Sequence, residues 1–122
     1  MTTKIEAMQR INTAKGSKLL HEGNTMWSNC GRHGTDEGWW LNIPLARFQN
    51  DIHIILNRDS SKLFLHLTIK AREILSPAMK FRCKDQAAEI FIPAANMKRL
   101  ADACPGGSKH SFNRNLQNEY RC

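Results

Sequence analysis

Long hydrophobic runs are missing from this chain of 122 residues. Its longest purely apolar stretches are only a few residues, such as 54–56, whereas a membrane-spanning helix needs about 20. The first residues, Met-Thr-Thr-Lys-Ile-Glu, also lack the apolar core of a secretory signal. These absences predict a soluble protein, and we expect a cytoplasmic location and no membrane partner.

Closely spaced cysteines are absent, and the wide, irregular spacing of those present does not suggest a secreted disulfide scaffold. Reduced thiols are therefore predicted at all four positions, Cys30, Cys83, Cys104 and Cys122. Zinc would accept two thiolates with two imidazoles. The nearest pattern is Cys30 with His33, followed much later by Cys104 with His110. Because that second spacing is unusual, we predict no metal and no cofactor, and zinc at these four residues stays open as an alternative.

Catalytic templates are also missing. No aspartate or glutamate has a lysine two positions later, as one large class of metal-dependent nucleases requires. The segment 104–109 resembles a phosphate-binding turn only superficially, because a helix rather than a strand is expected before it. We therefore expect a protein that is not an enzyme, with no catalytic residue assigned. The alternative is a small hydrolase or nuclease that uses the acids Asp36 and Glu37 with His33, or the pair His53 and His66.

The composition that is present is ordinary for a globular protein, with 41% hydrophobic and 24% charged residues. This length predicts one domain over residues 1–122. A helix is expected between Thr3 and Gly16, because Thr3 and Glu6 have capping-box spacing and Gly16 is a typical stop. Residues 17–38 are glycine-rich without clear periodicity, and they are predicted to form a long loop.

Alternating apolar residues predict a strand over 39–45, which Pro44 places at a sheet edge or ends early. Residues 52–56 and 63–69 flank a polar turn and predict an antiparallel hairpin. Pairing Leu56 with Leu63 places seven aliphatic side chains on one face and sets His53 opposite His66. A slip of two residues would keep the faces and separate the histidines.

Further along, a helical turn is expected over 71–75, short strands over 79–83 and 88–92, and a helix from Asn96 to Cys104. The polar tail 108–122 could dock as a short helix. The predicted fold class is α+β: a meandering antiparallel sheet of four to five short strands, with an N-terminal and a C-terminal helix packed on one face.

The formal net charge of +7 is uneven, because the segment from Lys62 to Lys84 carries six basic residues and one acid, Glu73. Such a segment favours a nucleic-acid or acidic protein partner, since neutralising phosphates needs several cations on one surface. A solvated basic face that maintains solubility is the plainer interpretation. The candidate binding residues on this segment are Lys70, Arg72, Lys80, Arg82 and Lys84.

Three other residues are candidates for binding. Adjacent strand residues point to opposite faces, so burial of Trp39 would leave Trp40 free to stack on a base or to form a homo-oligomer contact. The His53 and His66 pair could ligate a metal or act as a proton shuttle, although an ordinary half-buried cross-strand pair is the plainer interpretation. The sequence thus favours a small basic binding protein, with an oligomeric structural or interaction protein as a further alternative.

Overall fold

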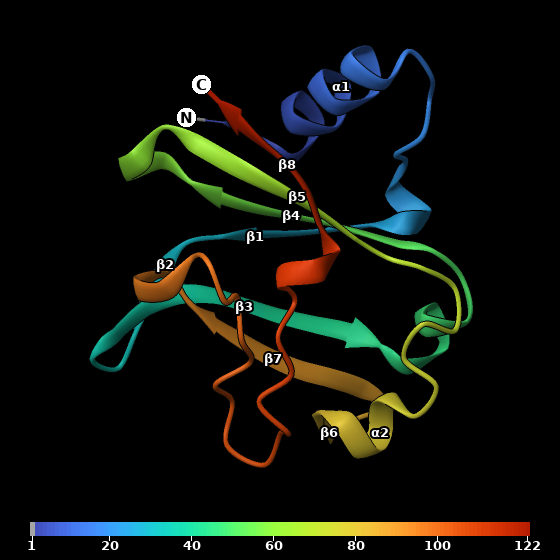
Figure 1. Ribbon diagram of the computed structural model, residues 1–122, viewed down its shortest axis with the longest axis vertical. Coiled ribbons are helices and arrows are strands. Elements are labelled where there is room, and N and C mark those ends of the chain that lie inside the picture. Colours follow the sequence, from blue (N-terminus) through green and yellow to red (C-terminus); the bar gives the residue numbers. More distant parts are fainter. Residues whose placement is uncertain (1) are drawn as a thin grey trace.

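The computed structural model describes residues 2–122 as an α+β fold with two four-stranded sheets. Sheet A has the order β1 (Thr25–Asn29), β4 (Ile52–Arg58), β5 (Leu63–Ile69) and β8 (Leu116–Arg121). Sheet B has the order β2 (Gly31–His33), β3 (Asp36–Pro44), β7 (Ala87–Pro93) and β6 (Arg82–Lys84). Figure 1 shows the sheets as two layers, with helix α1 (Lys4–Lys15) above sheet A. The predicted single sheet is therefore wrong, although the fold class is correct.

The smaller elements connect the strands. Helix α2 (Pro77–Lys80) precedes β6, and five 3₁₀ turns complete the chain: η1 (Glu22–Asn24), η2 (Leu45–Gln49), η3 (Asp59–Ser61), η4 (Ala94–Asn96) and η5 (Asn113–Asn115). Within residues 2–122, no helix has both the length and the apolar composition required to cross a membrane.

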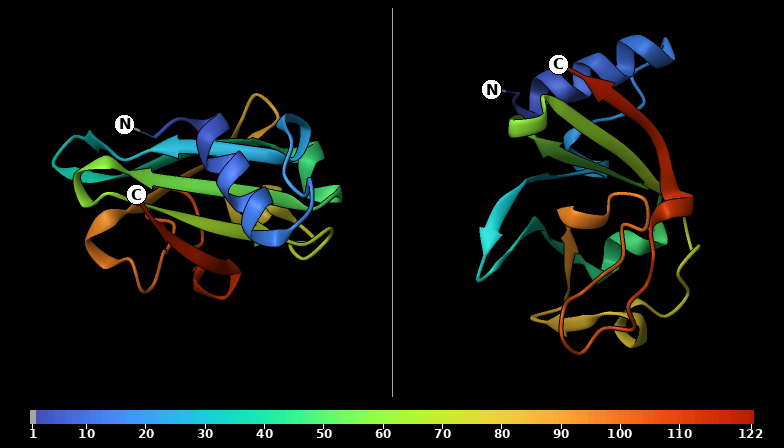
Figure 2. Two further views of the ribbon diagram at one scale, coloured as in Figure 1. Left: turned by 90° about the horizontal axis from the view of Figure 1, so that it is seen from above. Right: turned by 60° about the vertical axis from the view of Figure 1, so that its left-hand side comes forward.

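Helix α1 confirms the capping prediction at both ends. The Thr3 hydroxyl accepts a hydrogen bond from the Glu6 backbone N–H at 3.2 Å, and Gly16 closes the helix in the left-handed conformation at φ 70°. Ala7 and Ile11 are fully buried against sheet A. The helix therefore covers the face of sheet A that points away from sheet B (Figure 2).

Strands β4 and β5 are buried on both faces because they are the central strands of sheet A, which lies between α1 and sheet B. The seven aliphatic side chains predicted to share one face all lie in the core between the two sheets: Ile52, Ile54, Leu56, Leu63, Leu65, Leu67 and Ile69. The opposite face packs against α1 through Ile55 and Phe64.

The hairpin register differs from the prediction by two residues. Leu56 pairs with Leu65 rather than with Leu63, because β4 continues through Arg58 and the loop shortens to residues 59–62. The Lys62 N–H donates to the Asp59 carbonyl at 3.0 Å, and Lys62 adopts φ 51°. This tight turn fixes the register, which alternation alone leaves free by steps of two.

Residues 17–38, expected to form a loop, instead contain η1, β1, β2 and the start of β3. Strand β1 runs parallel to β4, with Trp27 beside Ile55. Strand β3 ends at Pro44, as predicted, but lies inside sheet B rather than at its edge. A parallel pairing between distant segments leaves no local signal in the sequence, and glycine composition alone was misleading here.

The C-terminal predictions also need correction. Residues 96–104 form no helix after η4, and the tail 108–122 supplies β8 instead of a short helix. Asp102 explains part of this, since its carboxylate accepts hydrogen bonds from the Phe91 N–H at 3.0 Å and the Cys104 N–H at 2.9 Å. These bonds hold the segment alongside β7, so no second helix packs on sheet A.

Candidate nucleic-acid interface

An aromatic cluster lies on the face of sheet B that points away from the core. The Trp40 and Phe91 rings are neighbours across β3 and β7, with centroids 6.0 Å apart. His33, from β2, completes the cluster at 5.9 Å from Trp40 and 5.2 Å from Phe91. Phe91 is buried, Trp40 is half-buried and His33 is exposed. The cluster therefore has an apolar base and presents two rings to solvent.

Strand alternation explains why one tryptophan is free and its neighbour is not. Trp39 is fully buried between the sheets, and its indole N–H donates to the Asn57 carbonyl at 2.9 Å. Trp40 points the opposite way, as predicted. Gly38 makes room for the cluster, because a Cβ there would lie 2.3 Å from the Ile92 carbonyl oxygen and 2.8 Å from Phe91 Cζ.

A guanidinium group completes the surface. The Arg82 guanidinium carbon lies 5.6 Å from the centroid of the Trp40 ring, within the range of a cation–π contact. Arg82 also forms an ion pair with Glu89 at 3.0 Å. Glu89 therefore holds Arg82 over the indole while cancelling part of its charge. Lys84, two residues along β6, lies on the same face as Arg82 and is exposed.

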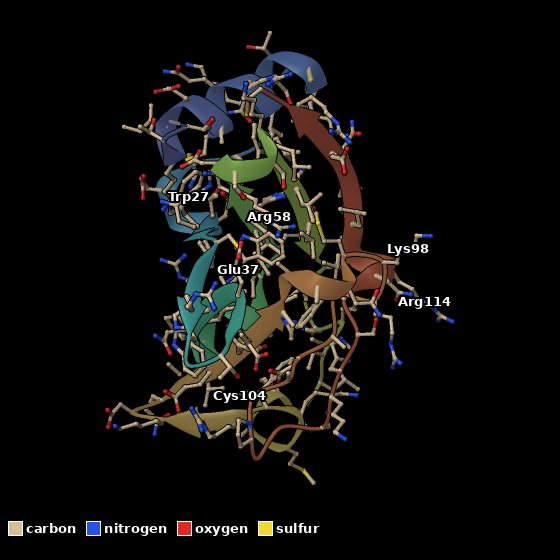
Figure 3. All side chains as sticks on the ribbon, turned by 90° about the vertical axis from the view of Figure 1, so that its left-hand side faces the viewer. Trp27, Glu37, Arg58, Lys98, Cys104 and Arg114 are labelled. Atoms are coloured by element: carbon tan, nitrogen blue, oxygen red, sulfur yellow. The ribbon has the colours of Figure 1, made fainter. Side chains whose placement is uncertain are left out.

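The other basic residues of the segment do not form one continuous surface with this face. Lys62 and Lys70 flank opposite ends of β5, and a seven-residue strand spans about 20 Å. Lys70 and Arg72 belong to the loop after β5, and Lys80 ends α2. Basic side chains also occur elsewhere, since Lys98 and Arg114 project from another side of the molecule (Figure 3). Of the basic residues in the segment 62–84, Arg82 and Lys84 are the two that the sheet register places on the same face as Trp40.

The structure separates His53 and His66 from this face. Both are buried beneath α1 on the far side of sheet A, at 4% and 1% exposure. His53 lies opposite Thr68 rather than His66, yet the His53 Nδ1 and His66 Nε2 atoms are 3.0 Å apart along the diagonal. The predicted opposition is therefore wrong, and so is the expectation that a two-residue slip would separate the rings.

Burial also determines the protonation of this pair. Desolvation lowers the pKa of His53, and it lowers the pKa of His66 to about 4, with the charge of His53 adding to the effect. Both rings are consequently neutral at pH 7. They are enclosed between α1 and sheet A, which fits the interpretation of a structural cross-strand pair.

The remaining polar candidates are dispersed. Glu37 points toward Arg58, 3.4 Å away, and accepts a hydrogen bond from the Cys30 thiol (Figure 3). It therefore lies apart from Asp36, which pairs with His33 on the other face of the β2–β3 hairpin. Among residues 2–122, no three His, Cys, Asp or Glu side chains gather closely enough to hold a metal ion.

Sequence reasoning selected Trp40 and Arg82 but missed Phe91, and it considered His33 only as a zinc ligand or a partner of the loop acids. The missing information was the register of β3 against β7, which places Phe91 beside Trp40. Strands were predicted over 39–45 and 88–92, but the sequence did not indicate that these two strands pair. His33 could not be placed because β2 was expected to be loop.

Comparison of the chain with protein-family models, with curated proteins and with solved structures finds no significant match.

Proposed function

We propose that this protein binds single-stranded nucleic acid on the outer face of sheet B. The observation that carries the proposal is the contact among Trp40, His33 and Phe91, with Arg82 over the indole. Stacking on an aromatic side chain is available to unpaired bases, which expose their faces, and contributes about 1–3 kcal/mol per base. An open sheet face that presents rings is suited to this mode.

Charge supports the same partner. The formal net charge of +7 attracts polyanions, and Arg82 and Lys84 lie next to the rings, where Glu89 offsets part of the Arg82 charge. Because only these two cations accompany the cluster, we expect a modest electrostatic contribution. Two phosphate contacts correspond to a slope of about −1.4 in a plot of log K against log salt concentration for a single strand. Stacking then provides most of the remaining affinity.

The test is fluorescence anisotropy with a labelled single-stranded oligonucleotide and with the corresponding duplex. We expect tighter binding of the single strand, and a loss of at least about ten-fold for Trp40→Ala. Trp27→Ala is the matched control, because Trp27 is also half-buried but packs between α1 and sheet A. Lys84→Ala should weaken binding and make the salt dependence shallower.

Two results would overturn the proposal. One is the absence of binding at low salt. The other is equal loss of affinity in the Trp40→Ala and Trp27→Ala variants. A concentration-dependent mass that Trp40→Ala abolishes, without oligonucleotide binding, would instead assign Trp40 to a contact between copies of the chain.

A further inference from the structure

Helix α1 and the segment that follows it cover the outer face of sheet A without joining its backbone. Within residues 2–122, no hydrogen bond links a main-chain group of residues 2–21 to a main-chain group of a strand. Apolar contacts hold this segment instead, through three buried side chains that pack on the sheet: Ala7, Ile11 and Leu20. We call residues 2–21 the lid. Because its contacts with sheet A are made by side chains, the lid can leave while every strand pairing stays intact.

Polar contacts add little to the hold on the lid. The Lys4 ammonium forms an ion pair with the exposed Glu22 carboxylate at 2.8 Å, and such a pair contributes little stability in water. The Arg10 guanidinium carbon lies 5.9 Å from the ring centroid of Phe64 and 5.7 Å from that of Tyr120. The closed position of the lid therefore depends largely on the burial of its apolar side chains.

The interface beneath the lid contains the two buried histidines. His53 and His66 lie on the face of sheet A that packs against the lid, with His53 Nδ1 3.0 Å from His66 Nε2. One ring must donate and the other accept, so two charged rings cannot keep this contact. When His66 is protonated, both of its nitrogens carry a proton, and Nδ1 has no partner among the described residues. The closed lid therefore accommodates the pair in its uncharged form.

The surroundings of the pair oppose a proton on it. Burial lowers the pKa of both rings, to about 4 for His66, where the charge of His53 adds to the effect. The other charged groups that act on the pair come from four segments: Lys15 in α1, His21 before η1, Asp51 before β4 and Lys70 after β5. Asp51 is the one acid among them, and its carboxylate already accepts a hydrogen bond from the Ala71 N–H at 2.7 Å. A ring released from the lid regains water and is charged more easily.

We propose that residues 2–21 form a lid that acid opens, because protonation of the His53 and His66 pair releases α1 from sheet A while both sheets remain paired. The remainder of the sheet is unaffected, since the pairing of β1 with β4 begins at Thr25, after the lid. Opening uncovers an apolar face that includes the stacked rings of Phe64 and Tyr120. The chain thus displays this face in acid and hides it at neutral pH. The device does not involve the face of sheet B that carries the proposed nucleic-acid site.

The test is hydrogen exchange of the whole chain between pH 7 and pH 4.5, followed by mass spectrometry. Protection is expressed relative to an unfolded chain at the same pH, which removes the intrinsic pH dependence of exchange. A released helix of 12 residues is marginal in water, so its amides should exchange once the lid opens. Protection of α1 should fall on the order of 20-fold from pH 7 to pH 5 through His66 alone. The amides of β4 and β5 should stay protected.

His66→Gln is the variant that tests the cause, because it removes the titrating ring and keeps a polar side chain. Protection of α1 should then depend much less on pH. His33→Gln is the matched control, since His33 is an exposed histidine on sheet B, and it should keep the wild-type dependence. Equal pH dependence in these two variants would overturn the proposal.

A second pair of variants decides the matter even if His66→Gln does not fold. Lys15→Gln removes a charge that opposes protonation of His66 under the closed lid, so it should reduce the pH dependence of α1 protection. Lys18→Gln changes another exposed lysine of the lid and should leave that dependence unchanged. The lid is ruled out if α1, β4 and β5 lose protection together, or if α1 stays protected down to pH 4.5.

Discussion

The His53 Nδ1 atom lies 3.0 Å from the His66 Nε2 atom in the layer between sheet A and α1. At this distance one ring donates a hydrogen bond and the other accepts it, so the contact requires that the pair not be doubly protonated. The Thr68 hydroxyl lies 3.1 Å from the same His53 nitrogen. His66 Nδ1 is buried without a partner among the described residues. The hydrogen bond between the rings is therefore lost when both are protonated, and burial already disfavours the first proton.

Acidification should destabilise the fold through this pair. The pKa of His66 is about 4 in the folded chain and 6.5 without burial, so the unfolded chain binds the proton first as the pH falls. The contribution of His66 to the free energy of unfolding is fully present above pH 6.5. It decreases by about 3 kcal/mol as the pH falls to 4. Urea unfolding at a series of pH values measures this. Lys15 is the other charged group that lowers this pKa, and its effect has the same sign.

His66→Gln is the control for this effect, because it removes the titrating ring. Its unfolding free energy should depend less on pH between 6.5 and 4 than that of the wild-type chain. Some dependence will remain, since burial also lowers the pKa values of His53 and His110. An identical pH profile for wild-type and variant chains would contradict a neutral buried His66.

Gly38→Ala should strongly destabilise sheet B. A Cβ at this position would lie 2.3 Å from the backbone oxygen of Ile92, which cannot move without breaking the β3–β7 pairing. We expect a loss of about 3 kcal/mol or more in the free energy of unfolding. Gly34→Ala is the comparison, because Gly34 adopts φ 66° in open space and should cost only about 1 kcal/mol. Equal losses in the two variants would contradict the close approach at Gly38.

Alkylation should distinguish Cys30 from the two exposed cysteines. Burial and the neighbouring Glu37 carboxylate raise the pKa of Cys30 from 9.0 to about 11. At pH 8 this thiol holds about 100-fold less thiolate than an ordinary one, and it should react correspondingly slowly with iodoacetamide. Cys83 and Cys122 are exposed and should react first. Mass spectrometry of peptides gives each rate.

Glu37→Gln provides the matching variant for Cys30. It removes the carboxylate charge and leaves Arg58, whose own charge lowers the pKa of the thiol. The alkylation rate of Cys30 should therefore rise relative to that of Cys83. An unchanged ratio would show that access to the thiol, and not its ionisation, limits the reaction.

Tyr120 allows packing and hydrogen bonding to be separated. Its ring stacks on Phe64 with centroids 4.9 Å apart, and its buried hydroxyl has no hydrogen-bond partner in the described part of the chain. Tyr120→Phe should therefore leave the stability unchanged or slightly raise it. Tyr120→Ala should lower the free energy of unfolding by about 3 kcal/mol, as measured in urea. A large loss in the Phe variant would mean that the hydroxyl has a partner in solution.

Local patterns determined which parts of this fold could be predicted. The α1 caps and the seven inward aliphatic residues of the hairpin depend on near neighbours, and both were predicted correctly. The register depended on a turn closed by Lys62 in a left-handed conformation, which alternation does not encode. The split into two sheets required pairings between distant segments, such as Trp27 beside Ile55, for which one sequence contains no signal.

The same distinction applies to the candidate site. Trp40 was identifiable because adjacent strand residues face opposite ways, and Arg82 because it lies in a basic segment. Their contact at 5.6 Å, and the presence of Phe91 beside them, arise only when β3, β7 and β6 are placed side by side. Charge along the sequence therefore indicated a broader surface than the fold assembles.

The position of β8 at the edge of sheet A has a consequence for synthesis on the ribosome. The β4–β5 hairpin has short-range pairings and can form soon after Ile69 emerges, but the outer edge of β5 pairs only with residues 116–121. Until those residues are made, an apolar strand presents unpaired backbone groups that invite association with other chains. A nascent chain stalled between residues 70 and 115 should therefore need chaperone protection that the finished chain does not.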